Sequence, residues 1–320
     1  MHPFGVKVEK NMELIQPMKQ KVWGWPAVIN FIFGGVAASF YLLCLLMASL
    51  KNNIPGESQL DALKLLAPIL TVMGFLALTA EAGRPLRGLY LFRNLHSSWM
   101  SRETLAGTLF VLTAAADCFF PHMILRVLAA VSALGLIISQ GFIVYCARAV
   151  IAWNVPIMPL VFVTSGFALG EGLVLVLASM GKLSLGFGPI VIGLFCVALD
   201  LVVWLIYLYW SNDAAFRKAT KILRHPIALT LTVGIGHLFP VLLLLLFVAV
   251  PGINTEGKFW NRIAALAGLF IVVGGVSQKF GIILWANYLR GIVLGQSKDG
   301  AQSVNSPINE GKHLGIKVFL

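Results

Sequence analysis

Long apolar stretches alternate with short polar ones over most of the chain. The apolar runs lie at about 24–50, 63–82, 104–120, 123–147, 157–181, 187–210, 226–250 and 263–289. About 20 apolar residues in a helix cross the hydrocarbon core of a bilayer. The pattern therefore predicts an all-α integral membrane protein with eight transmembrane helices. We expect a membrane domain over 23–290, preceded by a polar segment, 1–22, and followed by a tail, 291–320.

The composition agrees with this interpretation. The 320 residues are 58% hydrophobic and 12% charged, with a mean hydropathy of +0.87, whereas soluble domains are about 25% charged. The net charge of +11 lies in the loops, which indicates contact with membrane lipid rather than with nucleic acid. The first apolar run is too long for the core of a cleavable signal peptide, so we expect none.

The distribution of basic residues predicts the orientation. An even number of spans puts both termini on one side, and 17 of the 24 Lys and Arg residues fall on that side. Cytoplasmic loops of membrane proteins carry this excess. We therefore expect a multi-pass protein of the bacterial inner membrane with both termini in the cytoplasm.

Four ionisable residues lie deep inside predicted spans, namely Glu171, Asp200, His237 and Lys279. Each costs about 2.5–3.5 kcal/mol to insert, so they should face one another or a wet cavity, and we expect Lys279 to pair with Asp200 or Glu171. An ion pair that fixes helix packing and a proton path or ligand cavity both remain open. A b-type haem needs two facing imidazoles, and His237 is the only deep histidine, so we expect no haem.

The stretch EAGRPLRGLYLFRNLHSSWMSRE, residues 81–103, concentrates charge between two apolar runs. Glu81 falls in the last turn of its helix, where the helix dipole and burial disfavour the charged carboxylate while nearby arginines favour it. This balance suits proton exchange near neutral pH. We expect Glu103 in the first turn of the next helix, after an N-cap at Ser101, so it is either a helix-start carboxylate or part of a site.

The basic residues of this stretch admit two interpretations: they fix topology, or they bind a soluble partner. The four cysteines, Cys44, Cys118, Cys146 and Cys196, lie in or at the ends of apolar runs and form no CxxC pair. We therefore expect buried small residues, with no metal site.

The segment AGRPLRGLYLFRNLHSSWMSRE resembles the helix 2–3 region of the dimethyl sulfoxide reductase membrane-anchor family, which belongs to the polysulfide-reductase-like quinone subunits. The stretches WPAVINFIFGGVAAS and GGVSQKFGIIL and the pair Val155–Pro156 support the resemblance. The family implies eight helices in two four-helix bundles with no haem. It also implies a site for menaquinone or ubiquinone beside the face that docks a ferredoxin-like iron–sulfur subunit, which relays electrons to a molybdopterin catalytic subunit.

Carried over by position, Glu103 matches the family's glutamate near the quinone, and Glu81 stands where these anchors have a histidine. The resemblance thus predicts proton exchange at Glu81 and Glu103. The residues expected to line the quinone site are Trp25, Asn30, Arg84, Arg87, Asn94, Trp99 and Arg102. The deep set Glu171, Asp200, His237 and Lys279 is the candidate proton path.

The predicted orientation departs from the dimethyl sulfoxide and polysulfide reductases, whose catalytic subunits lie outside the cytoplasm. A sulfite-oxidising branch has cytoplasmic catalytic subunits, so sulfite oxidation with quinone reduction is the first expectation. The anchor of a periplasmic sulfur or N-oxide reductase that uses menaquinol is an alternative. A secondary transporter with a midplane site of Glu171, Asp200 and Lys279 is another.

Overall fold

A computed structural model describes residues 12–14, 18–50, 64–81, 90, 92–180, 187–249, 257–290 and 293–295. Arg84, Arg87 and the side chain of Glu81 lie outside the described residues, as do most of the predicted polar segments at the two ends of the chain.

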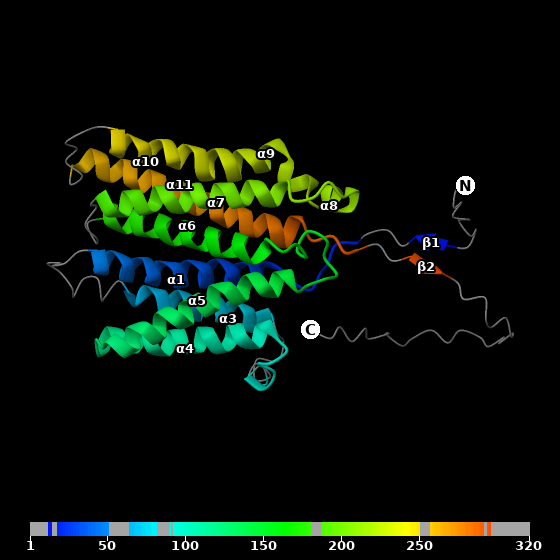
Figure 1. Ribbon diagram of the computed structural model, residues 1–320, viewed down its shortest axis with the longest axis horizontal. Helices are drawn as coiled ribbons and strands as arrows, with labels where there is room; N and C mark the ends of the chain where they lie inside the picture. Colours follow the sequence, from blue (N-terminus) through cyan, green and yellow to red (C-terminus); the bar gives the residue numbers. More distant parts are fainter. Residues whose placement is uncertain are drawn as a thin grey trace, which may run out of the picture.

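The first part of the chain forms a four-helix bundle, which we call the first bundle. Its helices are α1 (Trp25–Leu50), α3 (Leu66–Glu81), α4 (Trp99–Phe119) and α5 (Met123–Tyr145). They close a ring in which α1 packs on α3 and α5, and α4 packs on α3 and α5. Figure 1 shows these helices together on one side of the molecule.

The later part forms a second bundle. It contains α6 (Met158–Ser179), α7 (Phe187–Leu208) and α11 (Lys258–Phe280), and a helix that begins as α9 (Pro226–Leu229) and ends as α10 (Phe239–Ala249). Helix α6 also packs on α1 and α5, which joins the two bundles. The arrangement agrees with the two four-helix bundles that the resemblance implied.

Two helices of the second bundle are locally π-helical. Thr230–Leu238 connects α9 to α10 in this form, and Gly281–Trp285 continues α11. Such wide turns are rare and occur frequently at functional sites. The first stretch contains the buried His237, and the second begins two residues after the buried Lys279.

Six helices of the described chain are long and apolar enough to cross a membrane: α1, α5, α6, α7, the α9–α10 helix and α11. This establishes a multi-pass membrane protein. Helix α3 is apolar but shorter, and α4 carries Arg102, Glu103 and Asp117. The count of eight spans remains a prediction, since it requires both of these helices.

Short elements lie at the end of the bundles where α1 begins and α5 ends, which we call the terminal end. Strand β1 (Met12–Leu14) pairs antiparallel with β2 (Val293–Gly295), and α8 (Ala214–Ala219) follows α7. The sequence predicted an all-α protein, because three residues on each side are too few to show an alternating pattern. The pairing brings both ends of the described chain to the terminal end (Figure 1).

Backbone hydrogen bonds and buried side chains join the bundles at the terminal end. The amide of Leu289 donates to Met18 O at 2.8 Å, and the amide of Arg290 donates to Ala149 O at 2.8 Å. Trp153 Nε1 donates to Ile282 O at 2.8 Å within an apolar core that draws on both bundles. These contacts hold the start of α1 against the end of α11.

The α9–α10 helix and α11 approach each other through two glycines. A Cβ added to Gly274 would lie 2.3 Å from Gly236 Cα, and one added to Gly236 would lie 2.4 Å from Gly274 Cα. Small residues permit this backbone contact in membrane proteins. The contact places the π-helical stretch with His237 beside the last part of α11.

We predict that Gly274→Ala lowers the free energy of unfolding by about 1–3 kcal/mol, because two backbones must separate to admit a methyl group. Thermal unfolding in detergent measures the change. Gly188→Ala is the matched control, since a Cβ there would meet nothing within 4 Å. Equal midpoints for the two variants would contradict the close approach.

Candidate functional site

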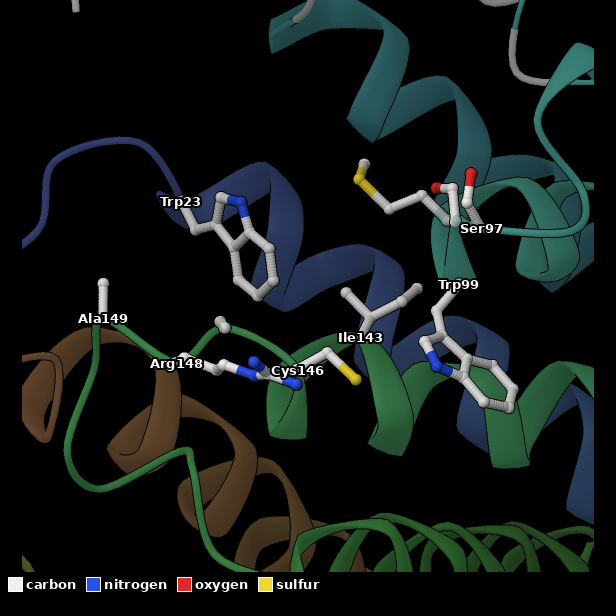
Figure 2. A pocket seen from close by; sticks show the side chains of 10 residues that line it. Trp23, Ser97, Trp99, Ile143, Cys146, Arg148 and Ala149 are labelled. Carbon is white, nitrogen blue, oxygen red and sulfur yellow. The ribbon is translucent and has the colours of Figure 1, made fainter. Parts of the chain in front are cut away.

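A cavity of about 570 Å³ opens at the terminal end of the first bundle. Its walls come from the start of α1, the start of α4, and the end of α5 with the segment that follows. Trp23 and Trp99 flank Ile143 and Cys146 in the view of Figure 2, and Arg148 supplies a cationic group. Aromatic and aliphatic walls with a few polar groups are typical of small-molecule sites.

A buried polar cluster lies deeper in the first bundle than this cavity. Met100 and Ile143 line the cavity, and Glu103 and Gln140 follow about one helical turn deeper on α4 and α5. Asn30 Nδ2 donates to Glu103 Oε1 at 2.9 Å, and Gln140 Nε2 donates to the same oxygen at 3.2 Å. All three side chains of this cluster are buried, with at most 3% of each exposed.

The structure corrects the expected start of α4. The helix begins at Trp99, and its N-cap is Ser98, whose Oγ accepts from the amide of Ser101 at 3.4 Å. The serine chosen from the sequence is three residues too late, because either serine satisfies the N-cap preference. Glu103 therefore lies beyond the first turn, and its partners are in α1 and α5, so it is not a helix-start carboxylate.

Trp99 and Arg102 fix the segment that leads into α4. The ring of Trp99 stacks on Phe142 of α5 with centroids 4.2 Å apart, and the Arg102 guanidinium lies 4.2 Å from the Trp99 ring centroid. Arg102 also donates to the carbonyls of Leu95 and His96, at 3.0 and 2.7 Å. Arg102 thus holds the rim of the cavity through its backbone contacts.

Several predicted lining residues do not line the cavity. Trp25 is 62% exposed and packs against Phe280, with ring centroids 4.8 Å apart, so its neighbour Trp23 occupies the cavity wall instead. The side chain of Asn94 is exposed, and its carbonyl accepts from the amides of Ser97 and Ser98. Trp25 is the first residue of α1, and its side chain lies against Phe280 rather than at the cavity.

The expectation of four buried cysteines was wrong for two of them. Cys44 and Cys196 are buried, Cys118 is partly buried and Cys146 is exposed at the cavity. Cys146 follows the last residue of α5, where the helix no longer covers its side chain. No group of three or more His, Cys, Asp or Glu side chains that could hold a metal occurs among the described residues.

The second bundle contains another buried cluster, centred on Asp200. Thr164 Oγ1 donates to Asp200 Oδ1 at 2.8 Å, and His237 Nε2 lies 3.0 Å from Asp200 Oδ2. His237 Nδ1 faces the carbonyl oxygen of Thr232. A neutral imidazole has one N–H, yet both ring nitrogens face oxygen. Which ring nitrogen donates depends on the tautomer of His237.

Lys279 does not form the ion pair that the sequence led us to expect. Among the described residues, its Nζ donates to Phe162 O at 3.5 Å and lies 4.3 Å from the Phe162 ring centroid. Asp200 of α7 instead pairs with His237, because the π-helical stretch places that imidazole next to Asp200. Lys279 still interacts electrostatically with Asp200.

Glu171 lies apart from this cluster. It is fully buried in α6, and neither carboxylate oxygen has a hydrogen-bond partner in the described part of the chain. A Cβ added to Gly193 of α7 would lie 3.3 Å from Glu171 Oε1. A buried carboxyl without partners is costly when charged, so this position suits a group that carries a proton.

The sequence did not single out Trp23 of the cavity wall, or Gln140, Thr164 and Gln278 of the two clusters. Gln278 Nε2 lies 3.3 Å from His237 Nε2. Gln140 and Gln278 are polar residues inside predicted spans and could have been found by the same reasoning that selected the charged ones. Thr164 carries no such signal, because its hydroxyl commonly bonds within its own helix.

The fold and its buried clusters define a polytopic helical membrane protein with a cavity above a buried carboxylate. Residues 13–116 match the family model described as polysulphide reductase, NrfD. The match confirms, for about a third of the chain, the resemblance seen in the sequence. It covers α1 and α3 and most of α4, including Asn30 and Glu103. A comparison with curated proteins found no match.

We predict that Asp200→Leu lowers the free energy of unfolding by about 3 kcal/mol or more, because it leaves Thr164 and His237 unpaired in an apolar interior. Asp200→Asn keeps an acceptor for Thr164 and should cost less. Thermal unfolding in detergent compares the two variants with Asp213→Asn, which changes an exposed carboxylate. A wild-type midpoint for Asp200→Leu would refute the stabilising role of the cluster.

Proposed function

We propose that the protein is the quinone-binding membrane-anchor subunit of a molybdopterin oxidoreductase. The observation that carries this proposal is the aromatic-walled cavity above the Glu103 carboxylate. The match to the polysulphide reductase family supports the class of complex. The anchor would exchange electrons between an iron–sulfur subunit and the quinone pool, and would turn over no substrate alone.

The cavity suits a quinone in shape and chemistry. Its volume of about 570 Å³ falls within the range of small-molecule sites, about 300–1,000 Å³. Trp23 and Trp99 offer flat apolar surfaces for a quinone ring, and Arg148 offers a hydrogen-bond donor. Menaquinone and ubiquinone share the ring chemistry on which this argument depends.

Proton exchange is assigned to Glu103. Reduction of a quinone takes two electrons and two protons, and a carboxyl near the ring can supply a proton to an oxygen. Glu81 ends α3 at the same end of the bundle and is proposed as a second proton-exchanging carboxylate. Arg84 and Arg87 remain proposed contributors to this site through their place in the matched segment.

The terminal end is proposed as the docking face for the ferredoxin-like iron–sulfur subunit, which would connect to the molybdopterin subunit. Its exposed basic residues, among them Arg93, Arg148, Arg217 and Lys218, suit an acidic partner surface. With the terminal end in the cytoplasm, sulfite oxidation coupled to quinone reduction is the favoured reaction. A periplasmic sulfur or N-oxide reductase is the corresponding function if the terminal end faces outward.

A proton path through the second bundle is a further part of the proposal. Asp200 and His237 lie within hydrogen-bond distance of each other, and neither carboxylate oxygen of Glu171 has a hydrogen-bond partner among the described residues. Lys279 lies between the bundles, 3.4 Å from the position of a Cβ on Gly35. The same residues would form the midplane site of a secondary transporter, and purification of a chain that transports a solute alone would favour that alternative.

We predict that Glu103→Gln lowers quinone turnover by the assembled complex about 100-fold, because glutamine keeps the size of the side chain but cannot release a proton. Quinone-coupled activity in membranes and copurification of the partner subunits are measured together. Glu81→Gln tests the second carboxylate in the same assay, with Asp213→Asn as the control. Wild-type turnover in Glu103→Gln would refute the role of that carboxylate.

We predict opposite locations for the two ends of the bundles. Alkaline phosphatase, which is active only outside the cytoplasm, should be inactive when fused after Arg290 and active when fused after Met180, because α6 begins at the terminal end and ends at the far side. Activity after Arg290 with none after Met180 would place the terminal end outside, and the periplasmic alternative would then replace the sulfite reaction.

A further inference from the structure

Gln140 lies outside the matched segment yet makes the contacts that organise the buried cluster. Its side chain is completely buried in α5. Its Nε2 donates to Glu103 Oε1 of α4 and to the backbone carbonyl of Asn30 in α1, both at 3.2 Å. One amide group therefore ties three helices together beneath the cavity.

A glycine in α1 makes room for this amide. A Cβ added to Gly34 would lie 2.2 Å from Gln140 Nε2, well inside contact distance. Any side chain at position 34 would displace the Gln140 amide from Glu103. The hydrogen bond from Gln140 to Glu103 can therefore be disturbed in two independent ways, by a substitution at Gln140 or by a side chain at position 34.

The donors select one oxygen of the carboxylate. Asn30 Nδ2 and Gln140 Nε2 both donate to Glu103 Oε1, and a proton on that oxygen would have to displace them. Among the described residues, no side chain or backbone group donates to Oε2. The proton of Glu103 is therefore directed to Oε2, and the orientation of the carboxyl group is fixed by Oε1.

The amide oxygen of Gln140 is also available for a hydrogen bond. This atom, Oε1, is buried and has no hydrogen-bond partner within the described residues, and such a group is costly unless a water or a ligand satisfies it. The next turn of α5 toward the terminal end carries Ile143, which lines the cavity. The free carbonyl is therefore a buried acceptor about one helical turn deeper than a residue of the cavity wall.

We propose that Gln140 is a positioning residue for proton exchange between Glu103 and a quinone in the cavity. This inference rests on the proposed function. In the reducing direction, two electrons arrive from a partner's iron–sulfur cluster, the proton on Oε2 passes to one quinone oxygen, and the other quinone oxygen takes the second proton, for which Glu81 is the proposed donor. The Glu103 carboxylate then takes a proton from water. Quinol oxidation runs the same transfers in reverse.

The test uses the assembled complex in membranes with Gln140→Met, which keeps the length of the side chain but removes the amide, and with Gly34→Ala, which displaces it. Both variants should lower kcat about tenfold and raise the solvent deuterium isotope effect, because proton transfer becomes slower. The KM for quinone should change less than kcat. Gly188→Ala is the matched control.

A second measurement separates this inference from the function on which it rests. Menadione, a naphthoquinone without an isoprenoid chain, quenches tryptophan fluorescence, and Trp23 and Trp99 line the cavity. Saturable quenching of the purified wild-type chain is expected, with similar affinity in both variants. If the wild-type chain shows no saturable quenching, the quinone site itself is wrong. If quenching is normal and both variants keep the wild-type kcat and isotope effect, only the role of Gln140 is overturned.

Discussion

The organisation of the first bundle depends on one buried carboxylate oxygen. Glu103 Oε1 accepts hydrogen bonds from Asn30 of α1 and Gln140 of α5, so three helices meet at one atom. In an apolar interior, an unsatisfied polar group costs several kcal/mol, and the helices must approach closely enough to supply these donors. Gly34 allows that approach. The cavity above the cluster follows from the same arrangement, since its walls are the next turns of the same helices.

The second bundle meets the same constraint differently. Its polar groups are satisfied in a chain from Thr164 through Asp200 to His237, and the imidazole reaches Asp200 from a π-helical stretch rather than a regular helix. The glycine contact between Gly236 and Gly274 brings the neighbouring helix alongside. Glu171 and the amide oxygen of Gln278 are exceptions, because these oxygens lack hydrogen-bond partners in the described chain. One bundle thus offers a cavity with an oriented carboxylate, and the other offers a set of buried ionisable groups.

The sequence was a good guide to what depends on local pattern. Hydrophobic runs located the helices to within a few residues for most of their ends, and the cost of burying charge identified Asp200 and His237. The sequence could not predict that Asp200 pairs with His237 rather than with Lys279, because this pairing depends on a π-helical stretch that the residue pattern does not indicate. Trp23 and Trp25 both suit the membrane interface, so the sequence could not show which of the two rings lines the cavity. The residue at which α1 begins determines that the Trp23 ring, and not the Trp25 ring, faces the cavity.

The account depends most directly on whether a quinone occupies the cavity above Glu103. Photolabelling of the membrane-embedded protein with an azidoquinone, followed by mass spectrometry of its peptides, tests this location. Labels are expected in 97–100 and 143–149, which line the cavity, and excess menadione should suppress them. Labels confined to the lipid-facing surface, or labels that menadione leaves unchanged, would contradict a quinone site at the terminal end of the first bundle.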